Sequence, residues 1–73
     1  MVGEARPFLD QMSPETVYVV TWTTEKTKRS VTGRFVSHDD ETLILMDEKG
    51  RFRNAPIDKI IRINYYEEGR APF

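Results

Sequence analysis

The chain has 73 residues, of which 38% are apolar and 32% are charged, so it holds one small domain with a single hydrophobic core. It has no cysteine, which excludes disulfides and thiolate metal sites, and His38 is its only histidine. Eleven Lys and Arg residues against twelve Asp and Glu give a net charge of −1, so any surface for nucleic acid requires local segregation of charge. A core of this size supplies only about 3–5 kcal/mol, which favours self-association.

The first predicted element is a short helix over residues 6–12. Pro7 is suited to a first helical position, and three apolar side chains fall on one side of the helix, namely Phe8, Leu9 and Met12. Residues 13–14 are Ser-Pro, which ends the helix because the residue before a proline avoids the α region. So short a helix is not stable alone in water, so we expect it to lie on the elements that follow.

Five β-strands are predicted after the helix, because the apolar residues change to a period of two. They cover residues 16–24, 29–37, 42–46, 51–54 and 59–66. The first is rich in β-branched and aromatic residues on both faces, which predicts a strand covered on both sides.

Two glycines add to this pattern. Gly33 inside the second strand indicates a bend or a close backbone approach, and Gly50 suits a hairpin turn. The pattern predicts a mainly β domain over residues 1–73: a strongly bent five-stranded antiparallel barrel after the short helix. Its ordered core spans about residues 6–66, and residues 67–73 form a loose tail.

No arrangement of residues predicts catalysis. His38 has Ser37 and Asp39 beside it, but neighbours on an extended chain point to opposite faces, whereas a hydrolytic triad is assembled from separate segments. The acidic run over residues 39–41 lacks the spacing of a calcium loop. We therefore expect no enzyme activity, no cofactor and no metal. Without a long apolar stretch or a signal-like start, the sequence predicts a cytoplasmic protein that does not bind membranes.

Basic residues cluster at three places in the predicted sheet. Arg51 and Arg53 share one face of the fourth strand, opposite Phe52. The other two groups lie around the first hairpin (Lys26, Lys28, Arg29 and Arg34) and on the last strand (Lys59 and Arg62). Such cations either hold phosphates and stack on bases, as in single-strand binders, or are solvated strand positions paired with nearby acids. The residues by themselves leave both interpretations open.

Short motifs in a fixed order carry a family resemblance. They are Pro-Phe-Leu at 7–9, Val-Tyr-Val-Val at 17–20, Thr-Gly-Arg-Phe-Val-Ser-His-Asp at 32–39, Leu-Ile-Leu at 43–45 and Ile-Ile-Arg-Ile at 60–63. In this order they resemble the Sm-like family of Sm, LSm and Hfq proteins, over about residues 6–66. The resemblance implies a bent five-stranded barrel that forms homo-oligomeric rings, hexamers or heptamers, by pairing the fourth strand of one subunit with the fifth of the next. It also implies that the ring binds single-stranded RNA.

The resemblance assigns two sets of residues. The RNA-binding set is His38, Arg51, Arg53 and Asn54, and the oligomer interface is Phe52, Ile61, Ile63 and Tyr65. One departure lies at the RNA pocket, where Asp40 or Glu41 stands in place of the base-stacking aromatic or histidine of the family. A carboxylate does not stack on a base as a ring does.

A second hypothesis is a small β-barrel that binds no nucleic acid. It is either a peptide-binding barrel of the Src-homology kind or a purely structural oligomer. The two hypotheses differ in a measurable way, because phosphate contacts release counterions and therefore make RNA binding weaken steeply with salt. A module that binds no nucleic acid shows no such dependence.

Overall fold

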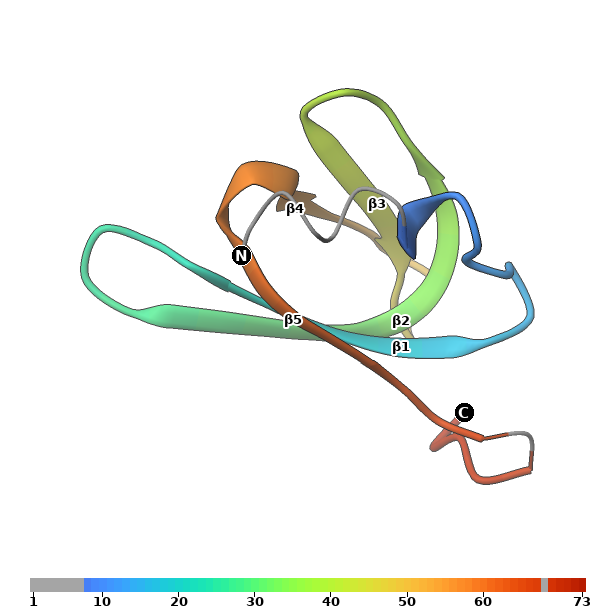
Figure 1. The fold of residues 1–73 in the computed structure, drawn as a ribbon. Coiled ribbons are helices and arrows are strands. Elements are labelled where there is room, and N and C mark those ends of the chain that lie inside the picture. The colour runs from blue at the N-terminus through green and yellow to red at the C-terminus, as the bar shows by residue number, and fades with distance from the viewer. Residues whose placement is uncertain (1–7, 68) are drawn as a thin grey trace.

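A computed structural model describes residues 8–67 and 69–73. It contains a five-stranded antiparallel sheet in the order β4-β3-β2-β1-β5 (Figure 1). The strands are β1 (Val17–Thr23), β2 (Lys28–His38), β3 (Thr42–Met46), β4 (Phe52–Pro56) and β5 (Ile60–Tyr65), and a 3-10 turn, η2 (Ile57–Lys59), joins β4 to β5. The predicted mainly β class with five antiparallel strands is confirmed.

The core lies on the concave side of the sheet. Val20 of β1 is fully buried and lies opposite Val31 of β2 and Ile63 of β5. The buried cluster takes side chains from every strand and from the segment before β1: Leu9, Met12, Tyr18, Val20, Trp22, Val31, Leu43, Leu45, Ala55, Ile57 and Ile60. On the other face of β1, Val17 is also buried, but Val19, Thr21 and Thr23 are only half-buried, so the predicted cover on both sides is found only at the start of the strand.

The predicted helix over residues 6–12 is replaced, in the described residues, by one helical turn. Residues 6 and 7 lie outside the described residues. The N–H groups of Gln11 and Met12 donate to the carbonyls of Phe8 and Leu9 at 2.9 and 3.3 Å, which are i to i+3 bonds of a tight turn. Leu9 and Met12 are nevertheless buried. The turn is therefore held by tertiary packing on the core and not by helix propensity.

The sheet is open, which corrects the prediction of a closed barrel. β5 pairs with β1 from Trp22 opposite Ile60 to Tyr18 opposite Tyr65, while β4 pairs with β3 on the far side. The η2 turn reverses the chain between β4 and β5 without pairing them, so each of these strands is an edge of the sheet. Strand propensity determines that five strands form. Closure of the sheet into a barrel would require β4 and β5, its two outermost strands, to pair with each other.

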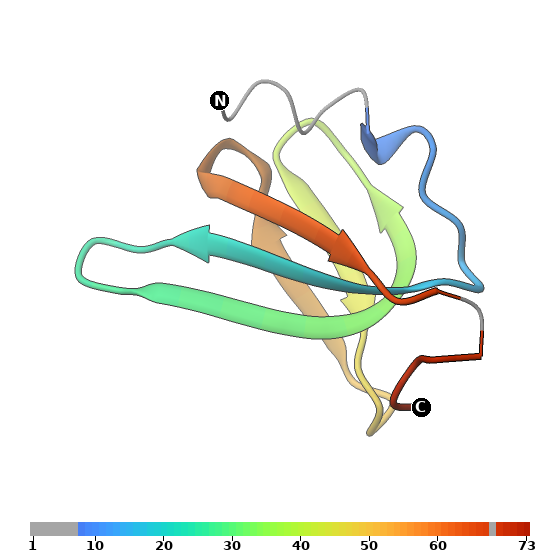
Figure 2. The same cartoon turned by 60° about the horizontal axis from the view of Figure 1, so that its bottom comes forward.

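β2 carries the bend that Gly33 predicts. The strand curves strongly in both ribbon views (Figure 1, Figure 2). A Cβ at Gly33 would lie 2.6 Å from the backbone oxygen of Met46 on β3, so only glycine permits this close approach. A register shift between Phe35 and Ser37 adds a bulge, which leaves Val36 exposed.

The end of the chain after β5 contacts the sheet through Phe73. The guanidinium of Arg34 on β2 donates 2.7 Å hydrogen bonds to the backbone oxygens of Glu15 and Phe73, and its Cζ lies 5.7 Å from the centre of the Phe73 ring. An open hollow of about 420 Å³ lies between these groups and Tyr66. Phe73 is thus held against Arg34 on the outer face of the sheet.

Candidate functional site

Asp47, at the end of β3, gathers the two arginines of the predicted RNA site. Its Oδ2 lies 3.4 Å from Nε of Arg51 and 3.4 Å from a guanidinium nitrogen of Arg53. Its Oδ1 accepts the backbone N–H groups of Arg51 and Lys49, both at 2.9 Å. The hydrogen bond from Arg51 is the main reason why the pKa of the Asp47 carboxyl lies below its usual value. Arg51 and Arg53 do converge, but on a carboxylate.

An open hollow of about 240 Å³ adjoins this cluster, where the β3–β4 turn approaches the middle of β2. Its lining brings together residues far apart in the sequence: Ser30, Val31, Thr32, Asp47, Glu48, Lys49, Arg51 and Arg53. Three cations and two carboxylates therefore surround it, and its charge is only slightly positive.

His38 lies at the end of β2, where its ring is half-buried. Nδ1 is 3.2 Å from the backbone oxygen of Asp39, and Nε2 is 3.5 Å from the carboxylate of Asp10. The ring centre lies 6.2 Å from that of Phe35. In the described part of the chain, His38 therefore contacts the segment before β1 and its own turn.

The β2–β3 turn is closed by Asp39. Its Oδ1 accepts the N–H groups of Glu41 and Thr42 at 2.8 and 2.7 Å, and these bonds lower the pKa of the carboxyl. The N–H of Ile57 in η2 donates to the backbone oxygen of Glu41 at 2.9 Å, so the turns after β2 and β4 lie side by side.

The predicted RNA residues do not gather at these two turns. His38 lies opposite Leu43 of β3, whereas Arg53 lies two positions further along β3, opposite Leu45, and turns to Asp47. Asn54, between them, is exposed on the other face of β4 from Arg53.

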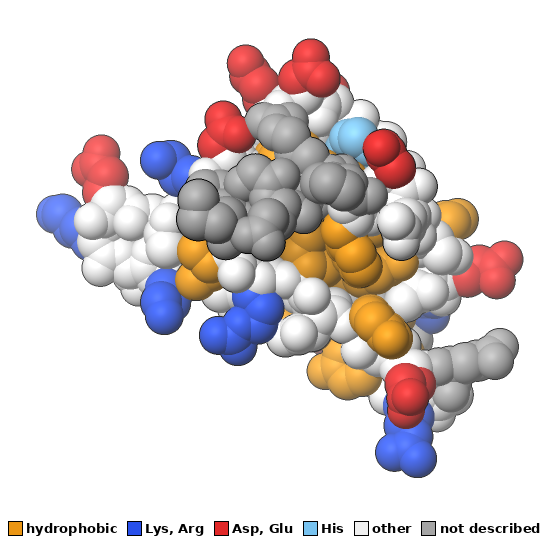
Figure 3. Space-filling view, in the orientation of Figure 1, with side chains coloured by type: hydrophobic (Ala, Val, Ile, Leu, Met, Phe, Trp, Pro, Cys, Tyr) orange, Lys and Arg blue, Asp and Glu red, His pale blue; other side chains and the backbone are white. Residues whose placement is uncertain are grey.

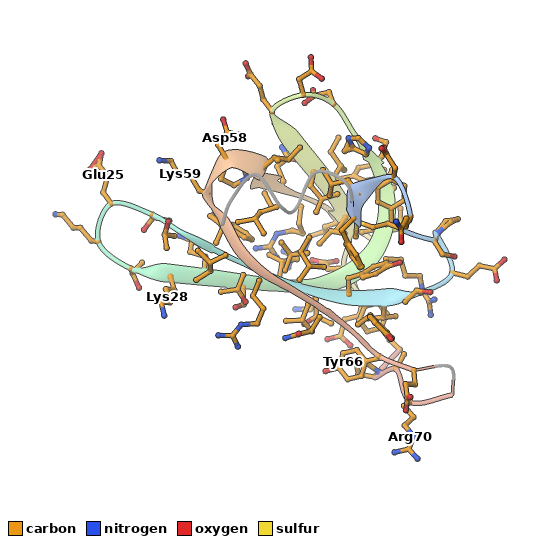
Figure 4. The ribbon with its side chains drawn as sticks, viewed as in Figure 1. Glu25, Lys28, Asp58, Lys59, Tyr66 and Arg70 are labelled. Atoms are coloured by element: carbon orange, nitrogen blue, oxygen red, sulfur yellow. The ribbon has the colours of Figure 1, made fainter. Side chains whose placement is uncertain are left out.

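The charge at these turns is negative. Acidic side chains gather over the β2–β3 turn, at the top of Figure 3, and Asp58 follows in η2 (Figure 4). Acids at this end oppose the approach of phosphates.

The two sheet edges carry the other predicted set. Phe52 on β4 is 64% exposed, and Ile61 and Tyr65 on β5 are 48% and 61% exposed. Ile63 is only half-buried and packs against the core. Three of the four predicted interface residues therefore present apolar surface along edges whose outward backbone groups have no strand partner among residues 8–67 and 69–73.

The fold brings together two groups of cations that are separate in the sequence, those around the β1–β2 hairpin and those at Lys59 and Arg62. β5 crosses back over β1, so that Arg62 lies opposite Thr21, next to the hairpin that carries Lys28. Basic side chains are grouped over this hairpin in Figure 3. The order of charges along the sequence does not predict that these two groups of cations are neighbours, because their proximity depends on which strand β5 pairs with.

Within residues 8–67 and 69–73, no group of three or more His, Cys, Asp or Glu side chains is placed to hold a metal ion. No helix in the same residues has the length and apolar character needed to span a membrane. Comparison of the chain with protein-family models, with curated proteins and with solved structures finds no match. The likeness to the Sm-like family therefore rests on the sequence motifs and on the strand pattern.

Proposed function

We propose that this chain is a self-assembling β-sheet module in which the β4 edge of one copy pairs with the β5 edge of the next. The observation that carries the proposal is the pair of open edges with exposed Phe52, Ile61 and Tyr65. An exposed apolar edge strand is a template for pairing with another chain, and proteins that stay monomeric protect such edges. Pro56, at the end of β4, removes one backbone donor, and β5 carries an irregular register at Ile61 and the charged Arg62, so both edges are only partly protected.

Side-chain orientation supports this pairing. Ala55 lies opposite buried Leu43, and Ile63 lies opposite buried Val20, so both face the core side of the sheet. Paired strands keep their side chains on matching faces. Pairing of β4 with β5 between copies therefore keeps the core-facing residues of the two edges on the same face of the continued sheet. Burying one large apolar side chain at such a contact stabilises it by about 1.5–3 kcal/mol.

The proposed contact joins two different edges, β4 of one copy and β5 of the next. Such a contact between non-identical surfaces is head-to-tail. A head-to-tail contact produces a ring when the rotation closes and a filament when it does not. The resemblance to the Sm-like family favours the ring, as a hexamer or heptamer. We expect a closed ring of at least five subunits.

The test is a measurement of mass by light scattering at tens of micromolar. The parent is expected to be a closed oligomer, and Phe52→Lys or Ile61→Lys to be monomeric. Val36→Lys is the matched control, because Val36 is 40% exposed but lies on β2, inside the sheet. It is expected to remain assembled.

Mixing the two edge variants distinguishes a head-to-tail contact from a symmetric one. Phe52→Lys keeps an intact β5 edge and Ile61→Lys keeps an intact β4 edge, so an equimolar mixture is expected to form a one-to-one dimer. A monomeric parent contradicts the proposal. A dimer formed by either variant alone contradicts the head-to-tail arrangement.

Binding of single-stranded RNA through His38, Arg51, Arg53 and Asn54 stays a prediction. It is supported by the hollow beside Arg51 and Arg53. It is opposed by Asp47, which already pairs both guanidinium groups. The oligomeric module is therefore the better-supported function, and the RNA prediction is tested through Arg53 in the Discussion.

A further inference from the structure

The β1–β2 hairpin projects beyond the rest of the sheet as a two-stranded ribbon (Figure 1, Figure 2). Its turn is closed by a 2.7 Å hydrogen bond from the Thr24 N–H to the Thr27 carbonyl, and the Thr24 hydroxyl donates to the same carbonyl at 3.0 Å. Further along, the hydroxyls of Thr21 and Ser30 are hydrogen-bonded across the two strands at 2.9 Å. The ribbon is therefore preorganised, and a ligand need not order it.

Five exposed cations lie on this ribbon and on the adjoining chain at the start of β5. They are called the ribbon cations and comprise Lys26, Lys28, Arg29, Lys59 and Arg62. In the described residues none of them forms an ion pair. The acids nearby are Glu25 at the tip and Asp58 before Lys59 (Figure 4), so the region has a net positive charge.

The ribbon cations face both sides of the sheet. Lys28 lies opposite Thr23 and Arg62 opposite Thr21, which places both side chains on the outer face. Arg29 lies opposite Trp22, on the other face. A ribbon with cations on both faces can meet anions on two sides at once.

The ribbon offers no stacking surface for bases. In the projecting part of the hairpin, residues 21–30, the one aromatic residue is Trp22, which is 7% exposed and belongs to the core. The exposed aromatic side chains lie on β4 and at the end of β5, namely Phe52, Tyr65 and Tyr66. Proteins that bind single strands combine a basic groove with aromatic platforms, whereas here only the cations are present. The ligand that fits this surface is a nucleic-acid duplex, which keeps its bases stacked inside and presents its phosphates outside.

We propose that the ribbon cations bind the phosphate backbone of B-form duplex DNA, with the ribbon seated in the major groove. This groove is about 12 Å wide, admits a two-stranded β-ribbon and has phosphates along both walls. The deep, narrow major groove of an A-form RNA duplex does not admit it. Because only phosphates are contacted, the binding is independent of DNA sequence. Lys26, Lys28 and Arg29 lie on the hairpin, away from the β4 and β5 edges, whereas Arg62 lies on β5 itself.

The number of ribbon cations sets the expected salt dependence of DNA binding. If all five ribbon cations contact phosphates, the logarithm of the binding constant falls with the logarithm of salt with a slope of about −4.5. Raising the salt from about 50 to about 200 mM then weakens binding by about 500-fold. The experiment is a fluorescence anisotropy titration of the full chain with a labelled mixed-sequence DNA duplex, compared with a single strand of the same length.

Arg29→Glu is the test variant and Arg70→Glu its matched control. Both change one exposed arginine to glutamate, but Arg29 lies on the ribbon away from both sheet edges, whereas Arg70 lies after β5, away from the ribbon (Figure 4). Arg29→Glu removes one phosphate contact and adds repulsion, so we expect a loss of about tenfold or more near 50 mM salt. Arg70→Glu is expected to bind as the parent does. Equal melting temperatures of the three proteins verify that the fold is intact.

Three results would overturn the proposal. The first is no binding of the duplex near the lower salt concentration, and the second is an equal loss in Arg29→Glu and Arg70→Glu, which would indicate a response to net charge alone. The third is tighter binding of the single strand than of the duplex. Each result is independent of the edge variants Phe52→Lys and Ile61→Lys, so failure here leaves the assembly proposal intact.

Discussion

Gly33 is the position at which one added carbon tests the fold most directly. In Gly33→Ala the new Cβ would lie 2.6 Å from the Met46 backbone oxygen, 3.0 Å from its carbonyl carbon and 3.3 Å from Cβ of Leu45. The first contact is with backbone, which cannot rotate away, so β3 must move by several tenths of an ångström. Arg34 pairs with Met46 next to this point, and that pairing is expected to loosen.

Two opposing effects set the magnitude. Replacing a mid-strand glycine with alanine normally stabilises a strand by about 0.5–1 kcal/mol. Overpacking of a close-packed site costs about 1–3 kcal/mol, and a backbone contact belongs at the upper end of that range. We expect Gly33→Ala to lose about 1–2 kcal/mol, equivalent to about 5–15 °C in melting temperature for a domain of this size. Gly33→Val, with two further methyl groups, is expected to lose more.

Thermal and urea unfolding followed by circular dichroism measures both variants, and Gly50 is the control. Gly50 has a φ of +78° and no atom within 4 Å of an added Cβ, so its requirement for glycine is conformational and not steric. Asparagine tolerates positive φ, so Gly50→Asn is expected to be much milder than Gly50→Ala. Gly33→Asn brings no such relief. A Gly33→Val variant that melts within a degree or two of the parent refutes the close approach of β2 to β3.

Three further predictions concern charged groups. The folded-state pKa values of Asp39 and Asp47 lie below the ordinary 3.8, so their ionised forms stabilise the fold above that pH and the stabilisation is lost as pH falls through the lowered values. We expect the urea midpoint to fall below about pH 4, and to fall less in the double variant with Asn at both positions, whereas identical acid profiles contradict this. Arg34→Ala is expected to speed amide hydrogen exchange over residues 69–73, which Arg34 holds through Phe73; unchanged exchange shows that the segment is held elsewhere. If RNA binds at the predicted site, Arg53→Ala weakens filter binding of uridine-rich or adenine-rich strands by about 1–3 kcal/mol and Arg70→Ala does much less, so equal small losses argue against the site.

The local sequence pattern was sufficient to predict where most of the strands lie. The β-branched run before residue 24, the apolar stretch Thr42–Met46 and the alternation around Gly33 each placed a strand to within about two residues of its observed ends. Each of these signals acts within a few neighbouring residues, through backbone propensity and side-chain alternation. The fourth strand was predicted too short, because Pro56 breaks an interior strand but is tolerated at an edge, where no partner needs its N–H.

The candidate sites depend on contacts that the local sequence pattern does not predict. Arg51 and Arg53 were correctly placed on one face, but only the packed turn shows that Asp47 reaches both of them. The turns after β2 and β4 meet through Glu41 and Ile57, a contact that depends on the packing of the whole sheet.

The sequence by itself therefore determined the class of fold, the number of strands and most of their limits, because these follow from local periodicity. The tertiary structure decided that β5 pairs with β1 and leaves β4 unpaired, which opens the sheet and creates both edges. The same pairing brings Arg62 beside the β1–β2 hairpin, and packing on the outer face lets Arg34 hold Phe73. Such contacts join residues tens of positions apart, and their free energy depends on the geometry of the whole sheet and not on any short stretch of sequence.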